Sequence, residues 1–426
     1  MSKLLLFSHS GFSDENANGI TMKNLLSAWN SSEKAEFFCD VEPPDFTAAD
    51  SYFRVTDMQM LAAFAGKRPN PVFRAADTEA VKPAFKQDPM KKSPARIPAW
   101  LKKRKYNFGL KWIREILWQI SPWGHRKLDQ WIDDLDPDVI VYMVGESIFM
   151  DHLVLRTLKR TSAKLVLYNG EAYRIINIKE RRGIERAYYC KTGKLYQKLS
   201  QRAALIIYNC MPLMKGYLEV FNSKSRQVLA YNSASAACSK YCPHSPLTIS
   251  YFGNLGVGRV DSLLQVADVL HRIYNNLILD IYGNAADEDK EKFAQHSNIR
   301  YHGFVSADML QEIMERSDIL VHVESFSPES ISQLQYAFST KLAQYLCAGR
   351  PILCYAPEGS TSAEYLKQEN GAVVAANLTE LESGLERLIM EPEVRIQYAR
   401  HAEQLGMKNH DRETTAAFVK QVIENL

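Results

Sequence analysis

The sequence predicts an α/β protein made of two Rossmann-like, doubly wound domains. Three observations lead to this prediction. The chain has 426 residues, about twice the length of an ordinary domain. Short apolar runs alternate with helical patterns along most of the chain, as in parallel sheets with crossover helices. A stretch rich in Ser and small residues, 223–246, interrupts this alternation, and we expect it to link the two halves.

The first half opens with the apolar run LLLF, followed by the loop HSGFSDENANGI and a helix expected at 21–29. Asp136-Pro137-Asp138 has the spacing of a metal-binding Asp-x-Asp motif. It precedes a strand and holds a proline, so we interpret it as the turn that starts this strand. The strands expected in this half are 4–7, 36–41, 139–144, 165–168 and 204–208.

The second half repeats the alternation, and its tail from about residue 391 is helical without a strand pattern. We therefore expect an N-terminal domain at 1–235, a C-terminal domain at 246–405 and a terminal helix at 406–426. Two such halves place the carboxyl ends of two parallel sheets at a cleft, where open α/β sheets bind ligands. The strands expected in this half are 247–252, 277–282, 299–302, 319–323, 352–355 and 372–374.

Composition excludes several classes of protein. The net charge of +3 gives no general attraction to nucleic acid, and no nucleic-acid partner is expected. Seven Cys without regular pairing indicate a reducing compartment, and CSKYCPH (238–244) matches no strong zinc pattern. The N-terminal apolar core is too short for a signal peptide, and no apolar run approaches the roughly 20 residues that span a bilayer. We expect a cytoplasmic protein.

The segment FSTKLAQYLCAGRPIL, residues 338–353, predicts a helix that can hold an anion. Ser339 or Thr340 can cap its start, and Gly349 can end it. A helix N-terminus offers unpaired N–H groups and partial positive charge, to which Lys341 adds a full charge. The alternative is an ordinary capped helix with a solvated lysine.

Two further turns lie between a strand and a helix. The run Gly253-Asn254-Leu255-Gly256-Val257-Gly258-Arg259 follows one strand, and its glycines allow a ligand to approach the backbone. Arg259 can grip two phosphate oxygens. The run Asn16-Ala17-Asn18-Gly19-Ile20 follows the first strand of the chain. Together the three turns fit a diphosphate held between the two halves.

These motifs, in their order, resemble a known family. Gly19-Ile20 before an early helix, YFGNLGVGR, LDIYGN, the FSTK block and Gly371 are similar to the group 1 (family 4) glycosyltransferases of the GT-B fold. The VHVES and FSTK segments resemble the branch found among bacterial surface-polysaccharide enzymes. The resemblance covers nearly the whole chain and is strongest over 249–375. It also implies that the C-terminal helix crosses back to the first domain.

The resemblance implies a nucleotide-diphosphate sugar, such as a UDP-sugar, as donor. Arg259 and Lys341 would neutralise the diphosphate, Ser339 and Thr340 would donate to it, and Gly19 would offer a backbone N–H. Neither a metal nor another cofactor is expected, because helix dipoles and basic residues can stabilise the leaving diphosphate. The residues implied for the nucleoside and ribose are Gly253, Asn254, Tyr282, Gly283, Gly303, Phe304 and Gln344.

The sequence departs from the family in its acidic pair. The family often has two Glu separated by seven residues, and here Tyr336 and Gln344 occupy these positions. Gln344 can still hydrogen-bond a ribose. Glu324 and Glu329 lie just upstream, and either could take the catalytic role that faces the sugar.

Candidates for the acceptor side end three strands of the first half. His9, Glu146 and Glu171 each follow an expected strand, at the edge where site residues gather. His9 is also a catalytic candidate toward the donor sugar. Each could instead be an ordinary loop residue.

Residues 82–126 combine many Lys and Arg with four Trp. Basic residues attract anionic headgroups and Trp favours the bilayer interface, so this segment could dock on the inner face of the cell membrane. A glycan or lipid-linked acceptor for bacterial capsule, O-antigen or exopolysaccharide synthesis would fit. The alternative is a solvated loop with Trp in the core.

Two other functions remain open on the sequence alone. A sugar-nucleotide 2-epimerase can use the same two halves, and a non-catalytic glycan-assembly scaffold would fit the missing acidic pair.

Overall fold

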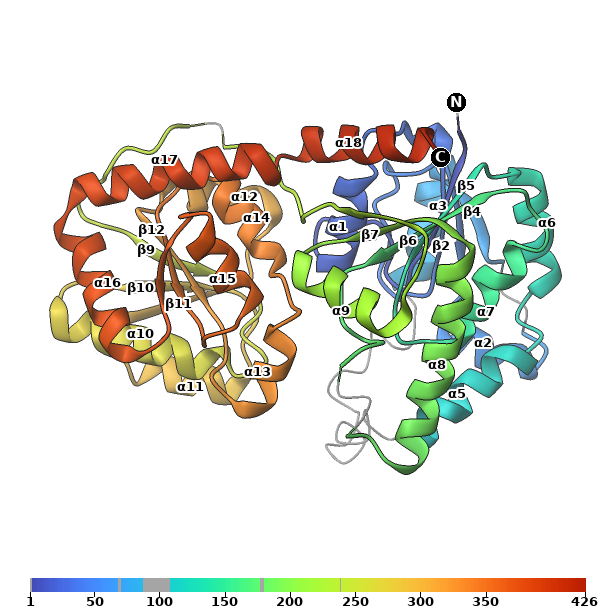
Figure 1. Ribbon diagram of the computed structural model, residues 1–426, viewed down its shortest axis with the longest axis horizontal. Coiled ribbons are helices and arrows are strands. Elements are labelled where there is room, and N and C mark those ends of the chain that lie inside the picture. The colour runs from blue at the N-terminus through green and yellow to red at the C-terminus, as the bar shows by residue number, and fades with distance from the viewer. Residues whose placement is uncertain (1, 68–69, 87–107, 177–179, 238) are drawn as a thin grey trace. The chain divides into compact units, whose positions relative to one another are not determined.

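The computed structural model describes residues 2–67, 70–86, 108–176, 180–237 and 239–426 (Figure 1). The chain forms two compact α/β units. Met1–Ala230 and Phe418–Leu426 make the N-terminal unit, and Tyr231–Ala417 makes the C-terminal unit. The predicted fold class is confirmed.

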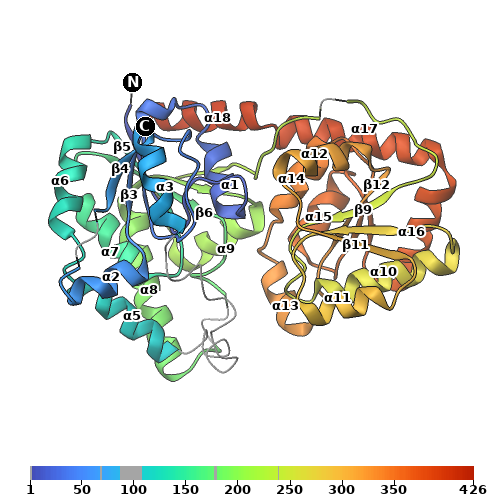
Figure 2. The same cartoon turned by 180° about the vertical axis from the view of Figure 1, so that it is seen from behind.

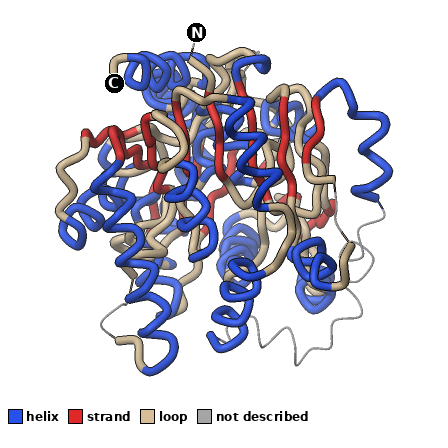
Figure 3. Tube along the Cα trace, turned by 90° about the vertical axis from the view of Figure 1, so that its right-hand side faces the viewer, coloured by secondary structure: helices blue, strands red, loops and turns tan. Residues whose placement is uncertain are grey.

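The described part of the N-terminal unit holds one eight-stranded sheet in the order β4-β3-β2-β1-β5-β6-β7-β8. All neighbouring strands are parallel except β3 and β4. Figure 3 shows strands lying side by side with helices packed against them. The strands are β1 (Leu4–Phe7), β2 (Lys34–Phe38), β3 (Ser51–Arg54), β4 (Val72–Arg74), β5 (Val139–Met143), β6 (Lys164–Asn169), β7 (Ala203–Tyr208) and β8 (Arg226–Leu229).

The helices of this unit lie in the connections between its strands. Most are amphipathic and bury one side against the sheet. They are α1 (Ala17–Leu25), α2 (Asp57–Phe64), α3 (Thr78–Lys86), α5 (Phe108–Ile120), α6 (His125–Leu135), α7 (Ile148–Thr157), α8 (Gly183–Arg202) and α9 (Met211–Phe221), with short 3₁₀ turns at Ser31–Glu33 and Ala75–Asp77.

The C-terminal unit has a six-stranded, all-parallel sheet among its described residues, in the order β11-β10-β9-β12-β13-β14. Its strands are β9 (Ile249–Phe252), β10 (Leu279–Tyr282), β11 (Ile299–Gly303), β12 (Ile319–Val323), β13 (Ile352–Tyr355) and β14 (Val373–Ala375). Its helices are α10 (Arg259–Ile273), α11 (Asp287–Ala294), α12 (Ala307–Arg316), α13 (Pro328–Leu334), α14 (Thr340–Cys347), α15 (Thr361–Gln368), α16 (Leu378–Met390) and α17 (Pro392–Asn409).

The last helix, α18 (Arg412–Glu424), carries the chain from the C-terminal unit into the N-terminal one. Val419, Val422 and Ile423 are buried in the core of the N-terminal unit. Lys420 Nζ donates to the carbonyl oxygen of Ala28 at 3.0 Å. The crossing back that the resemblance implied is therefore present.

The element boundaries differ from the sequence predictions in several places. The helix expected at 21–29 starts earlier, because the Asn16 side chain caps it by accepting the Gly19 N–H. The strand expected at 36–41 is displaced towards the N-terminus as β2. Strands β3 and β4 were not predicted, β8 lies in the expected linker, and α17 runs through the expected boundary at 405.

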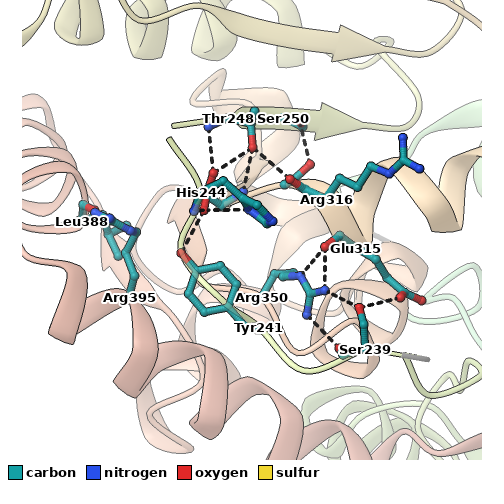
Figure 4. A network of polar contacts seen from close by, with 12 residues as sticks. Ser239, Tyr241, His244, Thr248, Ser250, Glu315, Arg316, Arg350, Leu388 and Arg395 are labelled. Atoms are coloured by element: carbon teal, nitrogen blue, oxygen red, sulfur yellow. Dashed lines mark hydrogen bonds and ion pairs between the residues drawn. The ribbon is translucent and has the colours of Figure 1, made fainter. Parts of the chain in front are cut away.

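The segment before β9 is attached to the C-terminal unit by a buried aspartate (Figure 4). Asp318 accepts hydrogen bonds from the Tyr241 hydroxyl at 3.2 Å and from the His244 N–H at 2.8 Å. It also accepts from the N–H and the hydroxyl of Thr248, both at 3.0 Å. These bonds satisfy the buried carboxylate and fix the chain where it enters the sheet.

A buried arginine extends this attachment (Figure 4). The Arg350 guanidinium donates to the carbonyl oxygen of Glu315 and to Ser239 Oγ at 3.0 Å. The His244 ring Nδ1 lies 3.2 Å from Asp318, while Cys242 is exposed and Cys238 lies outside the described residues. Residues 239–248 are therefore a structural clamp.

Part of the basic aromatic segment 82–126 lies outside the described residues, including Lys91, Lys92, Arg96, Trp100, Lys102, Lys103, Arg104 and Lys105. Trp118 and Trp123 are buried, and Trp112 packs edge-on against Tyr188 at 5.6 Å. Trp118 and Trp123 are core residues, as the alternative reading of the sequence proposed, whereas Trp112 is half-buried against a small cluster that includes Tyr188.

The packing of α18 predicts a stability effect. We expect Ile423→Ala to lower the free energy of unfolding of the N-terminal unit by about 2–4 kcal/mol, because it removes buried methyl groups. Urea titration followed by tryptophan fluorescence measures it. Gln421→Ala, an exposed change on the same helix, is the control and should change stability by less than about 0.5 kcal/mol. Equal effects of the two variants would contradict the packing.

Candidate functional site

The sheet of the C-terminal unit parts at its switch point, between β9 and β12. These strands pair only at Ile249↔Ile319 and Ser250↔Leu320. Beyond that point the Tyr345 hydroxyl accepts the Phe252 N–H at 2.9 Å and lies within 3.2 and 3.3 Å of the carbonyl oxygens of Phe252 and Val321. The phenol thus satisfies backbone groups that a strand would otherwise pair. A ligand site at such a point is typical of doubly wound sheets.

The glycine-rich turn predicted after β9 brings the backbone close to a lysine. Gly253 has a φ of +129°, and a Cβ at this position would lie 2.3 Å from Lys341 Cδ. The Asn254 side chain accepts the Gly256 N–H at 2.8 Å and shapes the turn. The turn ends at Gly258, directly before Arg259 begins α10.

Two cations meet beside this turn, as predicted. Arg259 Nε and Nη2 both lie 2.9 Å from Glu324 Oε2, and Glu324 follows the last residue of β12. Lys341 Nζ donates to the Tyr251 hydroxyl at 3.0 Å and lies 4.4 Å from the centre of its ring. The Tyr251 hydroxyl in turn donates to the carbonyl oxygen of Asn254 at 2.8 Å.

The electrostatics of this cluster favour an anionic ligand. Burial and the nearby Arg259 charge lower the pKa of Lys341 to about 7, while Glu324 opposes the shift. His322 is buried with no hydrogen bond at either ring nitrogen, and burial holds its pKa well below the usual value. His322 Nε2 is 3.4 Å from Glu324 Oε1. Among the described residues, Glu324 is the carboxylate that offsets the charges of Arg259 and Lys341. One carboxylate does not balance two cations, and a bound diphosphate would supply the missing negative charge.

The start of α14 lies at the same place, since Lys341 is in its first turn. Ser339 is the N-cap residue, with extended backbone and no capping hydrogen bond from its side chain. Its N–H donates to Ser362 Oγ at 3.1 Å. Thr340 is the first helical residue, and Gln344 lies one turn beyond Lys341 and is half-buried. The predicted helix is confirmed, and its cap hydroxyl is left for a ligand.

An aromatic stack ends three neighbouring strands. The Tyr282 ring lies 4.9 Å from that of Phe252 and 4.4 Å from that of His302, nearly parallel to both. His302 Nε2 lies 2.6 Å from Asp280 Oδ1. The Gly283 N–H donates to the Gly303 carbonyl oxygen at 2.8 Å. The structure thus brings Tyr282, Gly283 and Gly303 together, three of the residues expected to hold the nucleoside, and Phe304 next to them is exposed.

The two carboxylates considered for the catalytic role, Glu324 and Glu329, lie in different surroundings. Glu324 belongs to the cation cluster, whereas Glu329 is exposed in the first turn of α13 and outside that cluster. Tyr336 follows the end of α13. Of the residues considered for the role facing the sugar, the geometry favours Glu324.

In the N-terminal unit, His9 follows β1 and meets the Phe149 ring edge-on at 5.7 Å. Burial, together with the Arg114 charge, lowers the pKa of His9 to about 4. The imidazole is therefore neutral at physiological pH and can hydrogen-bond a hydroxyl group without carrying charge.

The role expected of Gly19 needs correction. Its N–H already donates to Asn16 Oδ1 at 2.7 Å, so it is not free to hold a phosphate. A Cβ at this position would lie 2.4 Å from the carbonyl oxygen of Gly11. Gly19 is thus required for the close packing of the loop after β1.

The acceptor-side carboxylates also differ. Glu146 Oε2 pairs with Lys111 Nζ at 2.8 Å, and its Oε1 accepts from the Tyr189 hydroxyl at 3.2 Å. Glu171 follows β6 and is exposed. Both lie beyond the carboxyl ends of strands, as expected; described partners hold the Glu146 side chain, whereas Glu171 is held through its carbonyl oxygen, which accepts from the Tyr217 hydroxyl at 2.9 Å.

Sequence reasoning missed Tyr251, His322 and Tyr345. Each is an apolar or aromatic position on a buried face, where a core residue is the default reading. The alternation in VHVE, which places His322 two residues before Glu324, is the only sequence feature that could have indicated one of them.

Comparison with known proteins now bears on these observations. Residues 264–421 match the family model described as "Glycosyl transferase-like". This part of the chain is therefore similar to glycosyl transferase-like domains. A search of the curated proteins finds no significant match.

Several solved structures share the fold of the whole chain. HepE of Anabaena in complex with UDP aligns over 100% of both chains with 12% identity and a TM-score of 0.65. WaaG, a glycosyltransferase involved in lipopolysaccharide biosynthesis, covers 98% of this chain and 99% of its own, with 12% identity and a TM-score of 0.58. A glycosyltransferase of Rickettsia africae covers 100% and 98%, with 12% identity and a TM-score of 0.61.

The fold is GT-B. The expectation that the chain is a glycosyltransferase is supported by the domain match and by these structures. Among the described residues, no group of three or more His, Cys, Asp or Glu is arranged to hold a metal ion. The expectation of a metal-free reaction remains a prediction.

The cluster predicts the behaviour of Lys341. Its amine should titrate near pH 7, because burial and Arg259 both disfavour the charged form. In Glu324→Gln the pKa should fall further, since the compensating charge is gone. NMR of ¹³C-methylated lysines, with Lys341→Arg for assignment, measures both. A pKa near the ordinary lysine value would contradict the geometry.

Proposed function

We propose that this chain transfers a sugar from a UDP-sugar to a glycan or lipid-linked acceptor, without a metal ion. The proposal rests on one observation. Two cationic side chains, Arg259 and Lys341, lie near each other beside the start of α14, where Ser339 makes no capping hydrogen bond, at the switch point of the sheet. Two cations beside a helix N-terminus can stabilise the negative charge that develops on a leaving diphosphate. The complexes of HepE with UDP and with UDP-glucose support the choice of nucleotide.

We assign the residues as follows. Arg259, Lys341, Ser339 and Thr340 hold the diphosphate, and Glu324 faces the donor sugar. The aromatic stack at Tyr282, with Gly283, Gly303 and Phe304, lies where the nucleoside would bind, and Gln344 is placed one turn from Lys341. His9, Glu146 and Glu171 remain candidates on the acceptor side.

The proposed setting is bacterial surface-polysaccharide synthesis at the inner face of the cell membrane. The involvement of WaaG in lipopolysaccharide biosynthesis supports it. The helices among the described residues include none that is both long and apolar enough to cross a membrane. We therefore propose peripheral contact with the membrane.

A screen of UDP-sugars for slow hydrolysis and for transfer tests the proposal. Release of UDP supports a transferase. Conversion of the donor into another sugar nucleotide would support an epimerase instead, and absence of donor binding would support a non-catalytic scaffold.

Loss of either cation should slow the reaction strongly. We expect Lys341→Ala and Arg259→Ala to lower UDP release from UDP-glucose or UDP-N-acetylglucosamine by roughly two to three orders of magnitude. Each removes a charge that stabilises the leaving diphosphate. Lys367→Ala, an exposed change in the same unit, is the control. An unchanged rate in Lys341→Ala would overturn the assignment.

Donor affinity should depend on pH through Lys341. Its amine is half-charged near pH 7 in the free site, and a bound diphosphate raises its pKa. Binding therefore takes up a proton above pH 7, and the affinity for UDP-glucose should fall by up to about tenfold per pH unit there. Calorimetry in buffers of different ionisation enthalpy measures the uptake.

The matched control for this pH dependence is Lys341→Arg, because arginine stays charged throughout the range. It should bind UDP-glucose with little pH dependence between pH 7 and 9. The same slope in both proteins would show that another group titrates.

A further inference from the structure

Helix α5 turns an apolar side outward. Leu110, Ile113, Ile116 and Ile120 are exposed by 44, 53, 50 and 63%. Their spacing places them on one side of the helix. A surface helix normally buries such a stripe, so this exposed row needs an explanation.

Polar contacts hold the opposite side of α5 in place. Glu115 is buried and accepts the Phe149 N–H at 2.7 Å and the Tyr188 hydroxyl at 3.0 Å. Lys111 pairs with Glu146 at 2.8 Å, and Arg114 Nε lies 3.0 Å from Asp57. The outward orientation of the apolar side is therefore fixed by the fold.

Helix α2 enlarges the exposed apolar surface. Met58, Leu61 and Phe64 are exposed at helical spacing, and α2 and α5 lie side by side in Figures 1 and 2. Asp57 joins the helices by also accepting the Trp118 indole N–H at 2.7 Å. We call these seven exposed residues of α2 and α5 the α2–α5 face.

A cationic groove flanks α5 on its other side. Its volume is about 770 Å³, and Trp118 and Gln119 of α5 line it together with α6, α7 and α8. Lys159, Lys198 and Arg202 line it as well, and they form no ion pair with any residue in the described ranges. Helix α5 thus carries the apolar face and also lines a groove whose Lys159, Lys198 and Arg202 have no ion-pair partner among the described residues.

The sequence adds charge of the same sign. Residues 86–107, which lead into α5, contain eight Lys and Arg and a single Asp. Apolar side chains bordered by cations match the two components of an anionic membrane surface, the acyl boundary and the headgroup phosphates.

We propose that the α2–α5 face lies on an anionic membrane, with the groove of Lys159, Lys198 and Arg202 receiving headgroup phosphate. This deepens the proposed transfer to a lipid-linked acceptor and rests on it for its purpose, although membrane binding can be measured without transfer. It also moves the contact from the Trp residues of 82–126, of which Trp118 and Trp123 are buried and Trp112 is half-buried, to the aliphatic side of α5.

Co-sedimentation of the full chain with vesicles tests the apolar part. The protein should bind phosphatidylglycerol–phosphatidylcholine vesicles and bind phosphatidylcholine vesicles much less. Ile113→Ser with Ile116→Ser should lower partitioning by about tenfold or more. Val220→Ser, on α9 and 51% exposed, is the matched control and should bind like the wild type. Equal binding of the double variant and the wild type would overturn the proposal.

Charge variants test the groove. Lys159→Gln and Lys198→Gln should each lower binding to the anionic vesicles by about fivefold. Lys215→Gln, an exposed change on α9, should leave it unchanged. Losses of the same size for all three lysines would contradict a built site. Inorganic phosphate at millimolar concentration should not displace the protein, whereas full displacement would indicate a free-phosphate site instead.

Two further measurements separate the alternatives. Sedimentation velocity should give the same mass for wild type and double serine variant. A dimer lost in the variant, with unchanged vesicle binding, would assign the face to a second copy.

UDP release from UDP-glucose should be unchanged in the variant. Absent UDP release with intact vesicle binding would overturn the proposed function alone, and the reverse result would overturn this inference alone.

Discussion

The candidate site depends on two cations, Arg259 and Lys341, that lie close to the buried carboxylate of Glu324. Arg259 is paired with Glu324, while Lys341 rests on the ring and hydroxyl of Tyr251. Burial and the nearby Arg259 charge lower the pKa of Lys341, and Gly253 leaves room for the lysine stem. Tyr345 keeps β9 and β12 apart at the same point. An arrangement that costs stability in this way is typical of a binding site.

In the N-terminal unit, the polar groups near the carboxyl ends of the strands are paired or neutral. Glu146 and Glu115 are committed to partners that orient α5, and His9 is neutral because it is buried beside Arg114. Charge in this unit therefore fixes structure near the carboxyl ends of the strands. The unpaired cations lie elsewhere, in the groove along α7 and α8. The charged cluster thus lies in the C-terminal unit, whereas His9 and Glu146 of the N-terminal unit are neutral or paired.

Local patterns in the sequence predicted most of the fold, and tertiary contacts account for what they missed. Strands such as β1, β12 and β13 are continuous apolar runs and were placed with their observed bounds. The short strand β3 mixes polar and aromatic residues and gives no clear period. Arg259 and Lys341 could be predicted because glycine turns and helix starts are local. Tyr345 could not, since its role lies in a contact with Phe252, which is 93 residues away. The stripe of α5 has the period of a core helix, and only the structure shows that it faces outward.

A crystal structure with UDP bound tests the donor seat most directly. We predict diphosphate oxygens within hydrogen-bonding distance of Lys341 Nζ and of the Arg259 guanidinium, at the start of α14. The base should then lie towards Tyr282. A well-ordered UDP bound elsewhere, with Arg259 and Lys341 making no contact to phosphate, would contradict the assignment.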